Sequence, residues 1–258
     1  MTYGKKIFQR AQLLLGSEAM DRMANANVIL FGVGGVGSWC AEALVRSGVY
    51  KLTIVDFDTV DVTNVNRQLK ATSQSVGMVK VDAMKARLLD INPDASVTSL
   101  RKVYSAETMN EFNLDDYDYV IDAIDSLKDK ALLILNACKS DATLFSSMGA
   151  ALKMDPTRFR VDEFWKVKGD PLAAALRRKF KHDGTFPKRK FKCVYSDELL
   201  KNKVEDDEDS LSFGKGSSAG KAPARMANGS LMHITSVVGC MLAGLVINDI
   251  NKKINSCK

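Results

Sequence analysis

Short apolar runs alternate with amphipathic segments over the first 150 residues of the chain. The apolar runs predict buried strands over 27–32, 51–56, 96–103, 117–122 and 143–148. The helical spacing of apolar residues predicts helices over 36–48, 78–91 and 128–139. Strands that alternate with helices form parallel sheets with right-handed crossovers. We therefore expect an α/β fold, with a doubly wound, mainly parallel sheet and helices on both faces.

The alternating pattern loosens after residue 149. A basic segment leads to a possible strand over 191–195, and the Gly/Ser/Lys-rich stretch 213–221 predicts a mobile loop. An apolar stretch over about 231–252 predicts a last helix, and its polar residues favour a buried helix over a membrane anchor. The expected organisation is a main domain over 1–150, a smaller basic extension over 151–230 and a docking helix over 231–258.

Composition and charge narrow the class of protein. Apolar residues make up 46% and charged residues 26% of the 258 residues, which excludes a largely disordered chain. The net charge is +6, but residues 158–192 hold twelve basic and four acidic side chains, a local excess of +8 that suggests a polyanionic partner. Five cysteines without a C-x-x-C pair argue against a disulfide framework and a four-thiolate zinc site. The N-terminal segment lacks the apolar stretch of a signal peptide, so we expect a cytoplasmic protein.

A glycine-rich loop follows the first predicted strand and opens the first predicted helix. Glycines let the backbone approach a phosphate, and the helix N-terminus offers free N–H groups. Two carboxylates, Asp56 and Asp58, follow the next strand, where a carboxylate can accept hydrogen bonds from ribose. We expect a nucleotide to contact the loop glycines Gly32, Gly34, Gly35 and Gly37.

Separate cations and carboxylates favour ATP over a dinucleotide. Arg67 and Lys80 can neutralise charge that shifts during phosphoryl or nucleotidyl transfer, which NAD does not require. Asp122 and Asp125 end the fourth predicted strand, where a carboxylate is well placed to hold Mg²⁺. ATP and Mg²⁺ are therefore the expected cofactors, and an NAD-dependent oxidoreductase remains an alternative.

Five blocks occur in an order that resembles the ThiF/MoeB superfamily of ubiquitin-activating-like adenylating enzymes. They are GVGGVGS, VDFDTVDVTNVNRQ, VGMVK, DINP and VIDAIDS. The resemblance implies a Rossmann-like fold and carboxylate adenylation, in which a carboxylate attacks the α-phosphorus of ATP and pyrophosphate leaves. Residues 1–150 would then be the nucleotide-binding, adenylating domain and residues 151–230 a substrate-binding insertion.

The resemblance also implies roles for individual residues. Asp58 would hold the ribose, Asn64 would hold the phosphates with Arg67 and Lys80, and Asp125 would bind Mg²⁺. Gln68 and Ser126 complete the expected nucleotide contacts. Arg10 would reach into a partner subunit, which implies a homodimer with composite active sites. The expected catalytic set is Arg10, Arg67, Lys80 and Asp125.

The second half is similar to the tRNA threonylcarbamoyladenosine dehydratase branch of this superfamily. The similarity rests on three blocks, DPTRFRVDEFWKVKGDPLAAALRRKF, KCVYSDE and NGS. It implies ATP-driven cyclisation of the threonylcarbamoyl group on the adenosine beside the tRNA anticodon. Cys193 is a candidate thiol for a thioester, with a buried packing role as the alternative. The basic segment fits tRNA phosphates, through Arg177, Arg178, Lys179, Lys188, Arg189 and Lys190.

Other functions stay open at the level of sequence. A sulfur-carrier or ubiquitin-like protein adenylyltransferase would share the ATP residues, although the two C-x-x-C pairs usual in the sulfur-carrier-activating members do not occur here. A non-catalytic tRNA-binding scaffold would not need the full ATP set. Sulfur-relay proteins are possible further partners of a family member.

Overall fold

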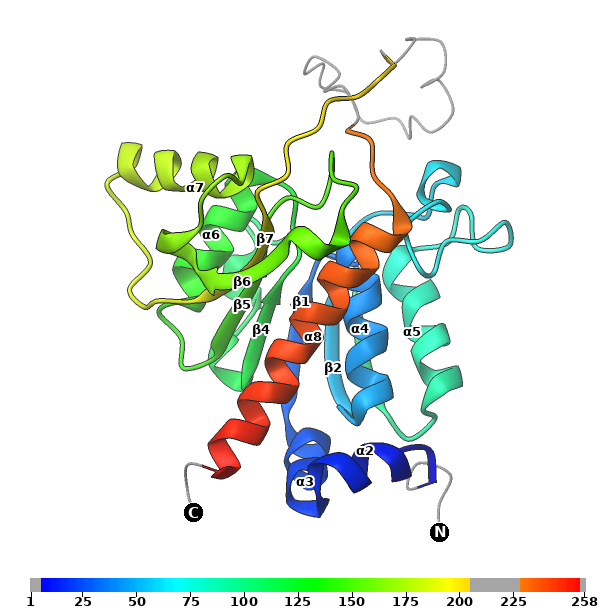
Figure 1. Cartoon of the computed structure of the whole chain (residues 1–258). Helices are drawn as coiled ribbons and strands as arrows, with labels where there is room; N and C mark the ends of the chain where they lie inside the picture. The colour runs from blue at the N-terminus through cyan, green and yellow to red at the C-terminus, as the bar shows by residue number, and fades with distance from the viewer. Residues whose placement is uncertain (1–5, 205–227, 256–258) are drawn as a thin grey trace.

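The computed structural model describes residues 6–204 and 228–255, and the predicted loop over 213–221 lies outside them. Figure 1 shows one seven-stranded sheet with strand order β3-β2-β1-β4-β5-β7-β6. All neighbours pair in parallel except β6, which is antiparallel to β7. The strands are β1 (Asn27–Phe31), β2 (Lys51–Val55), β3 (Ser96–Leu100), β4 (Tyr119–Asp122), β5 (Thr143–Ser147), β6 (Phe159–Glu163) and β7 (Lys192–Ser196).

Helices cover both faces of the sheet because successive residues of its central strand point to opposite sides. Val28 and Leu30 of β1 join a core with α3, α4, α5 and α8, whereas Ile29 and Phe31 join a second core with α6 and α7. The helices are α2 (Gln9–Leu15), α3 (Ser17–Asn25), α4 (Gly35–Ser47), α5 (Lys80–Ile91), α6 (Leu127–Ala137), α7 (Pro171–His182) and α8 (Met232–Asn255). The doubly wound α/β prediction is confirmed.

The predicted elements of the first 150 residues are all present, with ends shifted by a few residues. The possible strand at 191–195 is β7, and the last helix is α8. The sequence pattern did not predict β6, α7 or the two N-terminal helices. It also missed short 3-10 helices such as η1 (Val62–Asn64) and η5 (Phe164–Lys166).

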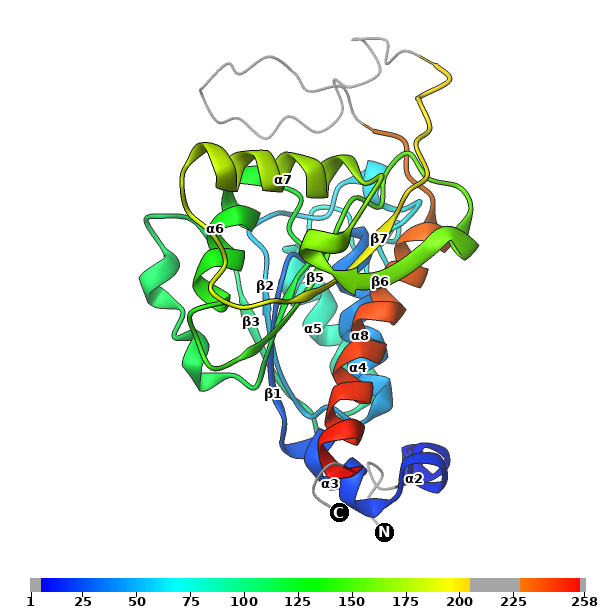
Figure 2. The ribbon, with the colours of Figure 1, turned by 60° about the vertical axis from the view of Figure 1, so that its left-hand side comes forward.

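The second half of the chain extends the main sheet. β7 pairs with β5, and β6 then forms the sheet edge, so the predicted basic extension shares the sheet of the first 150 residues. Helix α8 packs along α4, where Gly239 lies against the backbone of Val36 and Cys40 (Figures 1 and 2). Among the described residues, α8 is the one helix long and apolar enough to span a membrane, and 44% of its apolar window is buried inside the protein.

Candidate nucleotide-binding site

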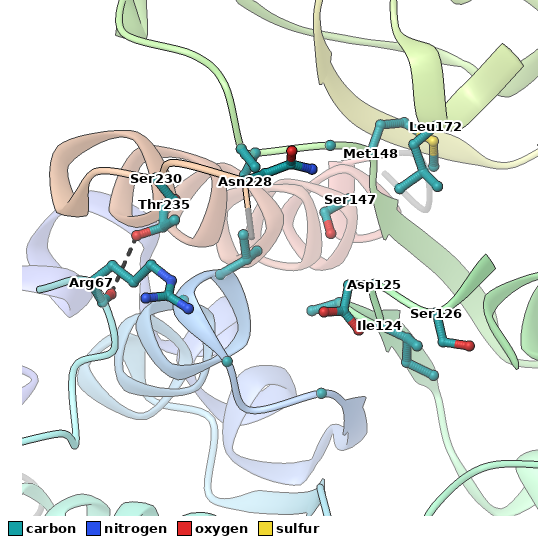
Figure 3. A pocket seen from close by; sticks show the side chains of 18 of the residues that line it. Arg67, Ile124, Asp125, Ser126, Ser147, Met148, Leu172, Asn228, Ser230 and Thr235 are labelled. Atoms are coloured by element: carbon teal, nitrogen blue, oxygen red, sulfur yellow. Dashed lines mark hydrogen bonds between the residues drawn. The ribbon is translucent and has the colours of Figure 1, made fainter. Parts of the chain in front are cut away.

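A cavity of about 670 Å³ opens where β1 and β4 lie side by side and the strand order reverses. Ligands of open α/β sheets bind at such switch points, beyond the carboxyl ends of the strands. Figure 3 shows side chains from both halves of the chain around this cavity. The predicted residues that line it are Gly32, Gly34, Gly35, Asp56, Asp58, Arg67, Gln68, Lys80, Asp125 and Ser126.

The glycine loop is held between the ends of three strands. The Gly32 N–H donates to the Val55 carbonyl (2.8 Å), and the Val33 N–H donates to the Asp56 carboxylate (2.7 Å). A Cβ on Gly37 would lie 1.8 Å from the Gly32 carbonyl oxygen, so this glycine permits close packing of α4 on the loop. Gly37 does not line the cavity. Gly37 thus has a packing role, its nucleotide contact stays a prediction, and the N-terminus of α4 faces the cavity through Gly34 and Gly35.

The two carboxylates after β2 have different partners. Asp56 accepts hydrogen bonds from Val33 N–H and from Asp58 N–H (3.0 Å), so its main contacts fix the loop backbone. The half-exposed Asp58 side chain accepts from Lys80 Nζ at 2.7 Å, while the Lys80 side chain is largely buried. Lys80 starts α5 and Asp58 lies in the loop after β2, so this ion pair joins the two at the cavity wall.

Asn64 ends η1, and Arg67 lies three residues further along the same crossover. Arg67 Nη1 donates to the Thr63 carbonyl (2.8 Å) and to Asn66 Oδ1 (2.9 Å), and its guanidinium lines the cavity. The buried Asn64 forms a capping box with Asp61 instead, and it does not line the cavity. In the structure Asn64 supports the turn that carries Arg67, and its phosphate contact stays a prediction.

Lys70 belongs to the site although the sequence analysis did not single it out. Its buried Nζ donates to the Val33 carbonyl of the glycine loop and to Gln68 Oε1 (2.7 Å). Burial, with the nearby Lys80 charge, lowers the pKa of Lys70 to about 7. This lysine ties a cavity-lining amide to the glycine loop. Its sequence signal is weak because one lysine in a polar turn resembles any surface lysine.

Of the two aspartates at the end of β4, one has a structural role and the other is exposed. Asp122 is fully buried and pairs with Lys130 Nζ (2.8 Å) and Ser146 Oγ (2.6 Å). Asp125 is exposed and lines the cavity (Figure 3), which leaves its carboxylate available to a ligand. Ser126 caps α6 next to it.

Asp125 fits a magnesium ion that is carried in by a nucleotide. Mg²⁺ is commonly held by one or two carboxylates together with substrate phosphates and water. Among residues 6–204 and 228–255, no group of three or more His, Cys, Asp or Glu side chains forms a cluster able to hold a metal by itself. A single exposed carboxylate suits Mg²⁺ that is bound to ATP, and Asp125 is the residue that could hold it.

The far side of the cavity comes from the second half of the chain. Thr235 of α8 donates to the Arg67 carbonyl (3.3 Å) and packs on Gly35 (Figure 3). Asn228 and Ser230 line the same wall. The remaining lining on this side consists of the segments 147–153, 171–172 and 198–200. The nucleotide side and this second side together form one continuous cavity.

Two predicted residues lie away from the cavity. Arg10 is exposed on α2, beside the amino end of the sheet (Figure 1), whereas the cavity lies at the carboxyl end. Cys193 is fully buried in β7 against the Asp162 carbonyl, and burial raises the pKa of its thiol to about 12. A thiol in this state is neutral and unreactive. The structure therefore favours the packing role for Cys193 over the thioester role.

The basic segment contains two kinds of side chain. Three of the predicted tRNA contacts have partners within the chain: Arg177 donates to the Phe164 carbonyl, Lys179 pairs with Asp183, and Arg189 donates to carbonyls between the end of α6 and the start of β5. Arg178, Lys188 and Lys190 are exposed and form no ion pair among the described residues. These three are the better candidates for phosphate contacts.

The fold and the cavity define a nucleotide-binding protein of the doubly wound α/β class. The model of the ThiF family matches residues 8–257, and the chain belongs to this family.

Relatives with assigned activities agree with the family. The chain is 42% identical over 254 residues to the tRNA threonylcarbamoyladenosine dehydratase of Bacillus subtilis, a match that covers 96% of this chain and 95% of that protein. It is similar to the crystal structure of the Escherichia coli enzyme, TcdA, in complex with ATP, with a TM-score of 0.83, 32% identity, and coverage of 98% and 96%. The molybdopterin-synthase adenylyltransferase of E. coli is more distant, at 28% identity over 180 residues, 70% of this chain and 69% of that protein.

Proposed function

We propose that this protein is an ATP-dependent tRNA threonylcarbamoyladenosine dehydratase. It would cyclise the threonylcarbamoyl group of the modified adenosine next to the anticodon. The observation that carries the proposal is the shared cavity: a glycine loop with Arg67 and Lys80 forms one side, and segments of the second half form the other. The second side includes residues from each of the three blocks that resemble the dehydratase branch: Pro171, Leu172, Glu198, Asn228 and Ser230. Near full-length similarity to the B. subtilis enzyme supports the same activity.

The chemistry needs two steps in one cavity. The threonylcarbamoyl carboxylate attacks the α-phosphorus of ATP, the bond to the β-phosphate oxygen breaks, and pyrophosphate leaves. The side chain then attacks its own activated carbonyl carbon, AMP leaves and a proton is lost, so the net change is the loss of one water. The second step is intramolecular and has a high effective molarity. No enzyme nucleophile is required, which agrees with the buried Cys193 thiol.

Charge neutralisation is the main task of the protein groups. Arg67 and Lys80 line the cavity beside the glycine loop, where they would offset the charge that develops on the phosphates. Asp125 would hold Mg²⁺, which supplies further positive charge to the departing pyrophosphate. Asp58 would accept a hydrogen bond from a ribose hydroxyl, which would replace part of its contact with Lys80.

A homodimer is part of the proposal. Helix α2 carries Arg10 and exposes Leu13 and Leu14 at 84% and 83%, an apolar surface that a second subunit could cover. The cytoplasmic location and the sulfur-relay partners remain predictions.

The activity can be separated from that of a protein-activating relative by its products. We expect AMP and pyrophosphate to form with tRNA that carries threonylcarbamoyladenosine, and not with unmodified tRNA or with a carrier peptide that ends in Gly-Gly. AMP-forming turnover, or adenylate formation, with the Gly-Gly peptide alone would instead support the sulfur-carrier adenylyltransferase.

A further inference from the structure

An exposed aromatic pair lies beside the basic segment, outside the nucleotide cavity. Trp165 of η5 and Phe186 of the loop after α7 are 37% and 52% exposed, and their ring centroids are 6.1 Å apart. The fully buried rings of Phe164 and Phe180 lie beneath Trp165, at 5.2 and 6.5 Å. Trp165 therefore packs on a buried aromatic core, and Phe186 packs on Trp165.

Two lysines without an ion pair among the described residues lie close to this pair along the chain. Lys166 follows Trp165 directly, and Lys188 lies two residues after Phe186; both are exposed and form no ion pair among the described residues. The nearby Asp183 is already paired with Lys179 and His182. Aromatic side chains interleaved with free cations are the pattern that binds unpaired bases by stacking and their phosphates by charge.

Helix α7 links the aromatic pair to the cavity. Leu172, in its first turn, lines the cavity, and Phe180 beside Trp165 lies eight residues further along α7, which is about 12 Å of helix. A stacked nucleic-acid strand rises about 3.4 Å per nucleotide, so this span corresponds to roughly three or four nucleotides. A base on the pair and an adenosine in the cavity can thus belong to one RNA loop.

We infer that Trp165 and Phe186 form a stacking platform for an unpaired base of the anticodon loop, with Lys166 and Lys188 on the flanking phosphates. The inference rests on the proposed function, because it takes the RNA to be the tRNA whose modified adenosine enters the cavity. It adds a single-strand contact to the charge-based contacts expected from the basic segment. A duplex RNA, whose bases are already stacked, gains nothing from the platform.

The test measures RNA binding by the full-length protein at one fixed salt concentration. The probes are a labelled anticodon stem–loop with threonylcarbamoyladenosine and a duplex RNA of equal length. Loss of one base–aromatic stack weakens binding about ten-fold, so Trp165→Ala raises the Kd for the stem–loop by that factor, while Trp165→Phe stays within about three-fold of the unaltered protein. Binding of the duplex stays unchanged in both. Val76→Ala, at an exposed apolar residue of the β2–α5 connection, is the matched control and changes neither Kd.

Tryptophan fluorescence distinguishes a direct base contact of Trp165 from a purely structural role. The chain has two tryptophans, Trp39 and Trp165. The Trp39 indole N–H donates a hydrogen bond to the Arg67 carbonyl. The stem–loop quenches tryptophan emission in the unaltered protein and much less in Trp165→Phe. ATP binding by each variant confirms that the fold is intact.

Different results of this test refute the stacking platform and the proposed dehydratase activity. Equal stem–loop affinity of Trp165→Ala and the unaltered protein, with normal ATP binding, overturns the platform whether or not tRNA is modified. A ten-fold loss restricted to the stem–loop, in a protein that removes no water from the adenosine, supports the platform and refutes the dehydratase. A loss that is equal for stem–loop and duplex also overturns it, because stacking on unpaired bases would not be involved.

Discussion

Lys70 shows how one residue connects stability to the nucleotide site. Its ammonium is buried under the glycine loop, so its pKa falls from 10.5 to about 7. Between these values the unfolded chain binds a proton that the folded chain does not, and the free energy of unfolding therefore rises with pH from about 7 to 10.5.

We expect Lys70→Met to remove this dependence. Urea unfolding at pH 7, 8 and 9 measures the free energy of unfolding of both proteins. Relative to the variant, this free energy should rise in the unaltered protein by up to about 1.4 kcal/mol per pH unit. A constant difference across this range would mean that Lys70 keeps its charge in the folded state.

Cys193 gives a second prediction at the scale of the residue. Because the thiol is buried and its pKa is raised, Cys193→Ala should leave turnover within about two-fold and cost about 1 kcal/mol of unfolding free energy for the lost sulfur contacts. Steady-state rates and urea unfolding measure the two effects. A loss of activity beyond ten-fold in a folded variant would restore the thioester role.

Residue types and spacing identified the glycine loop and several charged residues of the cavity lining, but not the partners of each side chain or the lining from the second half. Gly34, Asp58 and Lys80 follow a strand or open a helix, so the fold alone brings them to one edge. Gly37 and Asn64 instead support the loop and the turn, through contacts with backbone atoms. Such contacts depend on three-dimensional packing, which spacing along one chain does not contain.

At the scale of the element, the crossing of α8 over α4 positions Thr235 against the glycine loop. A Cβ at Gly239 would lie 2.5 Å from the Val36 carbonyl oxygen and 2.7 Å from Trp39 Cβ, whereas a Cβ at Gly244 of the same helix meets nothing within 4 Å. The first glycine sets the distance between the helices, and the second does not.

These two glycines form a matched pair for a stability measurement. Gly239→Ala should destabilise the protein by about 1–3 kcal/mol through overpacking. Gly244→Ala should stabilise it by up to about 1 kcal/mol through helix propensity. Urea unfolding of both variants tests the crossing, and equal stability of the two would show that α8 does not pack this closely on α4.

The elements that were not predicted share a physical cause. Helix α7 buries only Ala173, Leu176 and Phe180, and basic side chains dominate the rest of it. β6 is an edge strand with one buried residue, Phe159, so it lacks the apolar run of a central strand. Strands with both faces covered, such as β1 and β4, show that run and were predicted.

At the scale of the whole molecule, α2 lies beside the amino end of the sheet and the cavity beyond the carboxyl end (Figure 1). The five residues of β1 between these ends span about 17 Å. Arg10 therefore does not reach the cavity of its own chain, and any catalytic role for it requires a second subunit.

A mixing experiment tests that requirement. Arg10→Ala and Asp125→Ala are each expected to be nearly inactive as homodimers. With subunit exchange, half of the dimers are mixed and each has one intact site, so an equal mixture should recover roughly a quarter of the unaltered activity. Formation of mixed dimers without recovered activity would exclude Arg10 from the partner's site.

The central claim is that the shared cavity removes one water from threonylcarbamoyladenosine in tRNA at the expense of ATP. Mass spectrometry of nucleosides from tRNA, after incubation with the protein, ATP and Mg²⁺, measures this directly. We predict that the threonylcarbamoyladenosine signal is replaced by a nucleoside lighter by one water, with one AMP formed for each nucleoside changed. An unchanged nucleoside, from a protein shown to bind both ATP and this tRNA, would contradict the account.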